Sequence, residues 1–299
     1  MKRFLMNLQQ FAIDNFIPQI WSAELLVSLK KSLVYGQEGV VNRDYQGEIT
    51  GYGDTVKINS IGAITIGDYT KNEDMNAPET LSGAQTTLVI DQAKYFNFQV
   101  DDIDKAQQNP KVMQQAMIEA AYALRNAADQ YIANRMYQGA LSSALIGDDT
   151  TPAVPTKNDA YEYLVDLGTK LDEHDVPEES RWVIVPPWFY GLLEKDARFT
   201  HATAAGDDVI RNGVIGRAAG FTVMKSNNVP NTDGQKYKII AGHRIAFSYA
   251  EQINDVEAYR PERRFADAVK GLHLYGGKLV RPEGIAVLTA DRPSQEPQA

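Results

Sequence analysis

The four histidines are the first residues to consider, because an imidazole can bind a metal ion or transfer a proton near neutral pH. They are His174, His201, His243 and His273. No two of them lie close in the sequence, and none falls in an H-E-x-x-H or similar spacing. We therefore interpret them as histidines of loops or sheets, and we predict no metal site.

Catalytic nucleophiles and acid–base pairs are equally hard to find. The chain has no cysteine, which excludes disulfides, zinc–thiolate sites and a cysteine nucleophile. There is no G-x-S-x-G motif around a serine. Glu178 and Glu179 are adjacent, and adjacent side chains in a turn seldom converge on one bond. We predict neither catalytic residues nor a cofactor.

Two glycine-rich stretches and one acidic cluster resemble ligand sites only superficially. The segment Gly213–Gly220 and the run Gly276-Gly277-Lys278 match neither the dinucleotide fingerprint nor the phosphate-binding P-loop, so both are predicted to be turns. The run Asp101-Asp102-Ile103-Asp104 lacks the 12-residue layout of a calcium loop. A solvated turn, or a partner for a basic neighbour, is the interpretation that we adopt for it.

Composition and charge describe a globular, acidic protein. Of 299 residues, 43% are hydrophobic and 23% charged, which is enough to bury a core, and the net charge is −9. The densest basic spots, Lys30-Lys31 and Arg260 with Arg263-Arg264, are diluted by nearby acids. Tight binding to a phosphate backbone needs a basic face and is not favoured. An acidic wall can instead face packed DNA without adhering to it, although many cytosolic enzymes are as acidic.

No targeting or membrane segment is evident. The start, Met1–Phe11, is basic and then mildly apolar, but polar residues interrupt any signal-peptide core. No stretch approaches the roughly 18 apolar residues of a membrane span. We expect a protein that is made and kept in the cytoplasm, with no membrane partner.

The N-terminal third is predicted to be extended. Residues 1–35 indicate an amphipathic arm with a helix over Trp21–Leu33. Thr55–Asn59 and Ala63–Tyr69 are predicted to pair as a hairpin with a short turn, followed by a loop and a strand at Thr86–Asp91. A thin hairpin is only marginally stable alone. We expect arm and hairpin to gain little by folding back on their own domain and to contact another subunit.

The strongest predicted element is a long helix. Asn109 is a suitable N-cap and Pro110 a suitable first helical residue, and an apolar stripe at steps of three and four then continues to Gly139. The stripe consists of Met113, Met117, Ala120, Leu124, Ala127, Tyr131 and Ile132. At 1.5 Å per residue the helix is about 40–45 Å long, so it spans the body of the molecule.

The remaining chain predicts an α+β protein without internal repeats. Helices are expected at 158–173 and 188–195, and a buried strand at Arg181–Val185. Further strands are expected at 220–224, 237–241, 245–249, 272–275 and 285–288.

The order of these parts resembles the major capsid proteins of tailed bacteriophages, which have the Hong Kong 97-like capsid fold. The resemblance covers nearly the whole chain. Its fragments are Asn42–Tyr45 with Gly53–Ile58, Asp91–Asp102, the helix 109–139, Asn212–Gly216 with Gly220–Pro230, and Gly271–Ala290 with the run Arg281–Ile285. The specificity of the resemblance comes from the order in which these fragments follow one another.

The resemblance implies a peripheral domain with a long spine helix plus sheet, an axial domain, an extended β-hairpin loop and an N-terminal arm. The predicted segments are 1–41 for the arm, 42–92 for the extended loop, 93–180 for the peripheral domain, 181–255 for the axial domain, and 256–299 for the return to the peripheral domain and the tail. Members of this family are structural and assemble into hexamers and pentamers of an icosahedral shell that encloses viral DNA.

The same resemblance predicts the partners. The arm reaches Asn42 without room for a fused scaffold, so a separate scaffolding protein and a portal are expected, with DNA packaged without specific binding and assembly in the host cytoplasm. Trp21, Lys57 and Lys71 are the predicted interface residues, from their places on arm and loop. Two alternatives stay open: a bacterial nanocompartment shell of the same fold that carries enzyme cargo, and an enzyme of unknown reaction.

Overall fold

The computed structural model describes residues 33–44, 53–61, 66, 71, 83–101, 111–196, 198, 216–263 and 265–293. Several sequence predictions lie outside these residues. They concern Trp21 and the helix over Trp21–Leu33 apart from Leu33 itself, His201, Gly213 and Asp102–Asp104.

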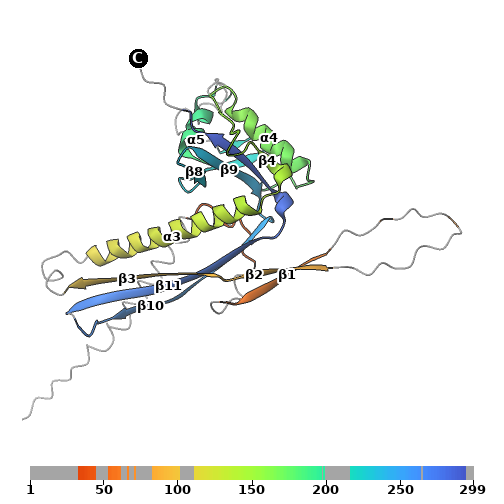
Figure 1. Ribbon diagram of the computed structural model, residues 1–299. Helices are drawn as coiled ribbons and strands as arrows, with labels where there is room; N and C mark the ends of the chain where they lie inside the picture. Colours follow the sequence, from red (N-terminus) through yellow and green to blue (C-terminus); the bar gives the residue numbers. More distant parts are fainter. Residues whose placement is uncertain are drawn as a thin grey trace, which may run out of the picture.

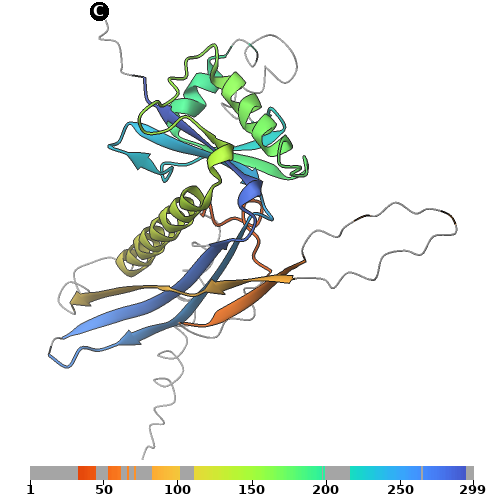
Figure 2. The same ribbon diagram turned by 45° about the vertical axis from the view of Figure 1, so that its right-hand side comes forward.

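A three-stranded antiparallel sheet and one long helix form the lower part of the molecule (Figure 1). The strand order is β10 (Phe247–Tyr259), β11 (Ala266–Leu279) and β3 (Gln92–Asp101). Helix α3 (Lys111–Gly139) lies between this sheet and the upper body (Figures 1 and 2). The predicted long helix is thereby confirmed.

The buried face of α3 differs slightly from the predicted stripe. Met117, Leu124 and Ile132 are buried as expected, but Ala121 and Ala128 are buried in place of the neighbouring Ala120 and Ala127. Near the start of the helix, Met117 and Ala121 pack on Val269, with Phe96 and Phe98 of β3 partly buried against them. Small alanines on this face let the helix lie close to the sheet.

The upper body is a seven-stranded mixed sheet covered by two helices. Its order is β4 (Leu145–Ile146), β12 (Ile285–Asp291), β9 (Lys236–His243), β5 (Arg181–Val185), β7 (Phe221–Lys225) and β6 (Arg217–Ala218), with β8 (Asn231–Thr232) paired to β9. The helices are α4 (Ala160–Asp172) and α5 (Pro187–Glu194), and single 3₁₀ turns occur at η2 (Ser142–Ala144) and η3 (Pro282–Gly284).

Strand β5 shows why this sheet is buried on both faces. Its five residues are all buried, as expected for a continuous apolar run. Val183 and Val185 belong to the cluster that includes residues of α4 and α5. Trp182 and Ile184 belong to the cluster on the opposite face, which also includes α3 residues. The seven-stranded sheet therefore lies between its own helices and the spine helix.

The hairpin joins strands that are further apart in sequence than predicted. Strand β1 (Thr55–Ile61) pairs with β2 (Gly83–Val89), so the prediction that 55–59 pairs with 63–69 is wrong. The observed register aligns Val56 with Leu88, so that the two side chains share one face. With Ile58 and Ile90 they pack on Ala250 and Leu274 of the three-stranded sheet, and this burial selects β2 as the partner.

The two glycine-rich stretches have different outcomes. Gly220, at φ +81°, lies in the turn between β6 and β7, in the left-handed region that glycine accepts without a Cβ penalty. Gly276 and Gly277 lie inside β11, so the prediction of a turn there is wrong.

The division into five segments stays a prediction. Strand β10 runs across the 255/256 boundary, and β12 pairs in the seven-stranded sheet.

Candidate assembly surfaces

The hairpin has one buried and one exposed face. Val56 and Ile58 each retain 5% of their accessible surface, whereas Lys57 between them is exposed. Lys71 is also exposed, in the segment that connects β1 to β2. Trp21 lies outside the described residues. An interface role for the three predicted residues stays a prediction, but two of them are available at the surface.

The base of the hairpin lies directly on the three-stranded sheet, and Gly276 makes this possible. A Cβ at this position would collide with the carbonyl oxygen of Val89 and would lie 2.9 Å from the Cα of Ile90. At Gly277 a Cβ would lie 2.6 Å from the ring of Phe247. Two neighbouring glycines thus clear one side of β11 for a crossing strand and the other for an aromatic ring.

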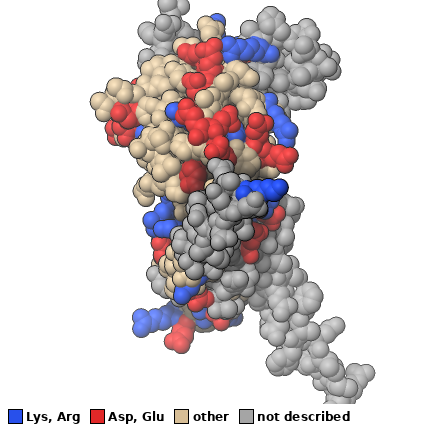
Figure 3. Space-filling model, turned by 90° about the vertical axis from the view of Figure 1, so that its right-hand side faces the viewer, with Lys and Arg blue, Asp and Glu red and all other residues tan. Residues whose placement is uncertain are grey.

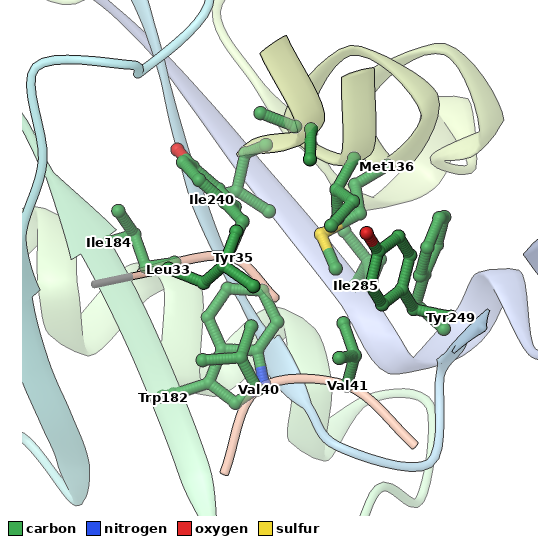
Figure 4. Close-up of a cluster of buried hydrophobic side chains, with 14 of the residues drawn as sticks. Leu33, Tyr35, Val40, Val41, Met136, Trp182, Ile184, Ile240, Tyr249 and Ile285 are labelled. Carbon is green, nitrogen blue, oxygen red and sulfur yellow. The ribbon is translucent and has the colours of Figure 1, made fainter. Parts of the chain in front are cut away.

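The end of the predicted arm is buried in its own subunit. We call residues 33–44 the strap. Leu33, Tyr35, Val40 and Val41 have no exposed surface. Figure 4 shows them between Trp182 and Ile184 on one side and Met136 and Tyr249 on the other. The expectation that the arm gains little by folding back on its own domain is wrong for this part, because its aromatic and branched side chains fill a gap between α3 and the two sheets.

One anchor of the strap is a carboxylate of the spine helix. Asp129 is 1% exposed, and its two carboxylate oxygens accept the backbone N–H groups of Val34 at 3.0 Å, Tyr35 at 3.1 Å and Gly36 at 3.3 Å. Burial raises the pKa of Asp129 despite these three hydrogen bonds, which lower it. The arrangement resembles a helix cap that is supplied from a distant part of the chain.

The second anchor is a buried cluster around Glu251 of β10. Arg43 of the strap donates from Nη1 to this carboxylate at 2.8 Å and from Nε to the Gly36 carbonyl at 2.8 Å. The Tyr249 hydroxyl donates to Glu251 at 2.9 Å, and the His273 Nε2 lies 3.2 Å from it. Burial raises the pKa of Glu251, but the His273 hydrogen bond and the Arg43 charge outweigh it, so the pKa is lowered.

The other residues considered for chemistry are dispersed. His174 contacts the Lys170 carbonyl at 2.7 Å and the Ser143 hydroxyl at 3.2 Å, which are structural contacts. Glu178 and Glu179 lie exposed in the turn before β5. Within the described ranges, no group of three or more His, Cys, Asp or Glu side chains is arranged to hold a metal ion. None of the described helices has the length and apolar character needed to cross a membrane.

Comparisons with known protein families and solved structures agree with this fold. The family model of the phage capsid protein matches residues 84–288. The chain belongs to the phage capsid protein family. It is a structural subunit of a phage head shell, and its α+β capsid fold is confirmed. A sequence search against curated proteins returned no significant match.

Solved structures of phage capsid proteins share this arrangement. A chain from Mycobacterium phage Che8 is 29% identical, with a TM-score of 0.72 over 86% of this chain and 91% of that one. The capsid structure of the cyanophage P-SCSP1u is 17% identical, with a TM-score of 0.67 over 82% of this chain and 85% of that one. The capsid of Ralstonia phage GP4 is 12% identical, with a TM-score of 0.64 over 90% of this chain and 92% of that one. At such low identities, these last two similarities concern the fold alone.

Proposed function

We propose that this capsid protein assembles into hexamers and pentamers that close an icosahedral shell around viral DNA, and that it has no catalytic role. The observation that carries the proposal is the hairpin. It buries one face on its own subunit and presents the other to solvent, and its connecting segment includes Ile66, which is 94% exposed.

The exposed face of the hairpin is suited to a neighbouring copy. It carries Thr55, Lys57 and Thr87 beside Val89, a large apolar residue that is 43% exposed. A two-stranded ribbon with one bare face gains stability when that face is covered. Many repeats of one modest contact stabilise a closed shell while single wrong contacts still dissolve. Lys57, Lys71 and Trp21 are the residues we assign to such contacts.

Charge supports a shell that holds DNA without binding it specifically. Figure 3, viewed from the side towards which the hairpin points, shows acidic side chains gathered over the upper body. Exposed acidic residues are dense from the end of α4 to the start of β5, at Asp172, Glu173, Asp175, Glu178 and Glu179. Such a face repels a phosphate backbone. We propose assembly in the host cytoplasm with a separate scaffolding protein and a portal.

The proposal is tested by electron microscopy of the overexpressed protein, alone and with the neighbouring genes of its source co-expressed. The expected result is uniform closed or angular particles of a size on the order of tens of nanometres, as many copies of a small domain with repeated modest contacts would form. Small soluble species alone, with the neighbours present, would contradict it. Catalytic activity of the purified shell towards a defined substrate would contradict the structural role.

A further inference from the structure

The two sheets of the subunit meet at a narrow junction. Strand β9 passes into β10 through residues 244–246, and β11 passes into β12 through residues 280–284. The two crossings touch, because Val280 and Arg281 both donate their N–H groups to the Ala246 carbonyl, at 2.8 and 3.1 Å. A junction of two short connections is a natural place for one sheet to rotate against the other.

The strap lies at this junction, in one buried cluster with residues of α3 and of both sheets. Tyr35 and Val40 share one buried cluster with Ile240 of the seven-stranded sheet, Ile132 of α3 and Tyr275 of the three-stranded sheet. All of these side chains have at most 1% exposed surface. Rotation of either sheet would therefore open a cavity or force the strap out.

Polar contacts also tie the strap to β10 of the three-stranded sheet and to α3. The backbone of Asn42 exchanges hydrogen bonds with Phe247 and Tyr249 of β10, at 2.9 Å each. Arg43 joins the buried Glu251 on the same strand, and Asp129 holds the other end of the strap to α3. Apolar contacts alone would let the segment slide, whereas these directional bonds fix its position.

We propose that the strap acts as a wedge that sets the angle between the two sheets, and that Arg43 and Asp129 are its positioning residues. A fixed angle in each copy fixes the curvature of a closed assembly, since every subunit repeats it. This second step rests on the proposed shell function. The first step, the wedge within one subunit, does not.

The wedge is tested by a distance measurement within one subunit. The chain has no cysteine, so two introduced cysteines can each carry a spin label. Lys94→Cys labels β3 of the three-stranded sheet, and Lys195→Cys labels the upper body after α5. Both positions are exposed. Labelled protein is diluted into unlabelled protein so that each distance comes from one copy. Arg43→Ala is compared with Lys270→Ala, which removes a 2.7 Å ion pair on the exposed face of the three-stranded sheet.

The expected result is a narrow distance distribution for the parent and for Lys270→Ala, and one at least twice as wide for Arg43→Ala. Equal widths in folded Arg43→Ala and Lys270→Ala would overturn the wedge. If Arg43→Ala does not fold, Arg43→Lys replaces it, because a lysine cannot bridge the Gly36 carbonyl and Glu251 as the forked guanidinium does. A width equal to the parent's would again overturn the proposal.

Shell diameter then tests the link to curvature. Shells of Arg43→Ala are expected to have a broader diameter distribution than shells of Lys270→Ala. Equal distributions, together with a broadened intramolecular distance, would remove the link and leave the wedge. Failure of the parent protein to form shells would count against the proposed function, and the label distances would still decide the wedge.

Discussion

The strap carries four side chains with no exposed surface, whereas the hairpin buries only alternate residues of its two strands. Both segments contact the three-stranded sheet, the strap through Asn42 and the hairpin through its buried face. The strap is enclosed by α3 and by both sheets of its own subunit, and the hairpin is covered on one face by the three-stranded sheet. The two segments therefore differ in purpose, because the strap completes its own subunit whereas the exposed face of the hairpin remains available to a neighbour.

The largest change in the free energy of unfolding is expected when an aromatic side chain of the strap is removed. Tyr35→Ala leaves a cavity in the core and is expected to lower the free energy of unfolding by about 3–5 kcal/mol. Tyr95→Ala is the matched control, since Tyr95 is 79% exposed, and its effect should stay within about 0.5 kcal/mol. Chemical denaturation of both variants checks this. Similar effects would place the strap outside the core.

A smaller effect is expected at the base of the hairpin. Ile58→Ala removes a side chain that is buried against one sheet only. We therefore expect the free energy of unfolding to fall by about 2 kcal/mol, at the low end for such substitutions. Thr87→Ala, on the exposed opposite face, is its control. A loss for Ile58→Ala as large as that for Tyr35→Ala would erase the distinction between the two segments.

The two strap anchors are expected to respond to pH in opposite directions. The pKa of Glu251 is lowered from 4.5, so its contribution to stability is present above 4.5 and is lost as the pH falls through the folded-state pKa. The pKa of Asp129 is raised from 3.8, so its contribution is present below 3.8 and is lost as the pH rises through the folded-state pKa.

Unfolding free energies between pH 3 and 7, roughly the range in which carboxyl groups titrate, measure this difference in two variants. Glu251→Gln should lose less stability than the parent on acidification. Asp129→Asn should lose less than the parent as the pH rises. Identical pH profiles for parent and variants would show that neither anchor titrates as described.

Sequence reasoning succeeded where a pattern is local. The helix Lys111–Gly139 and the strand Arg181–Val185 follow from periodicity and from a continuous apolar run. It failed where partners are distant. The strap has neither a helical nor an alternating pattern, because α3 and the two sheets bury it from different sides. In the sequence, Asp129 cannot be told from other acidic residues of a helix, because the strap amides that it binds are distant along the chain.

The hairpin partner and the paired glycines were missed for a related reason. Ala63–Tyr69 alternates as a strand does, but pairing is decided by which strand places apolar residues on the sheet below. Gly276 resembles a turn residue in sequence, and only the strand crossing above it explains the absent side chain. The buried cluster of Arg43, Glu251 and His273 gave no signal in sequence, since its members are widely separated.

The smallest effect on stability is expected on the exposed face of the hairpin. Lys57→Ala should change the free energy of unfolding by no more than about 0.5 kcal/mol. It should nevertheless reduce the yield of shells, because the same contact is repeated in every copy. Lys278→Ala, also exposed but on β11, is the control. Equal yields from both variants would remove Lys57 from the predicted interface.

Deletion of residues 60–82 tests the central distinction most directly. It joins Asn59 to Gly83, so that a Gly-Ala connection links Asn59 to its paired residue Gln85 and the buried base is retained. We predict a thermal unfolding temperature close to that of the parent and no shells by electron microscopy. Intact shells from the deleted protein would contradict the account.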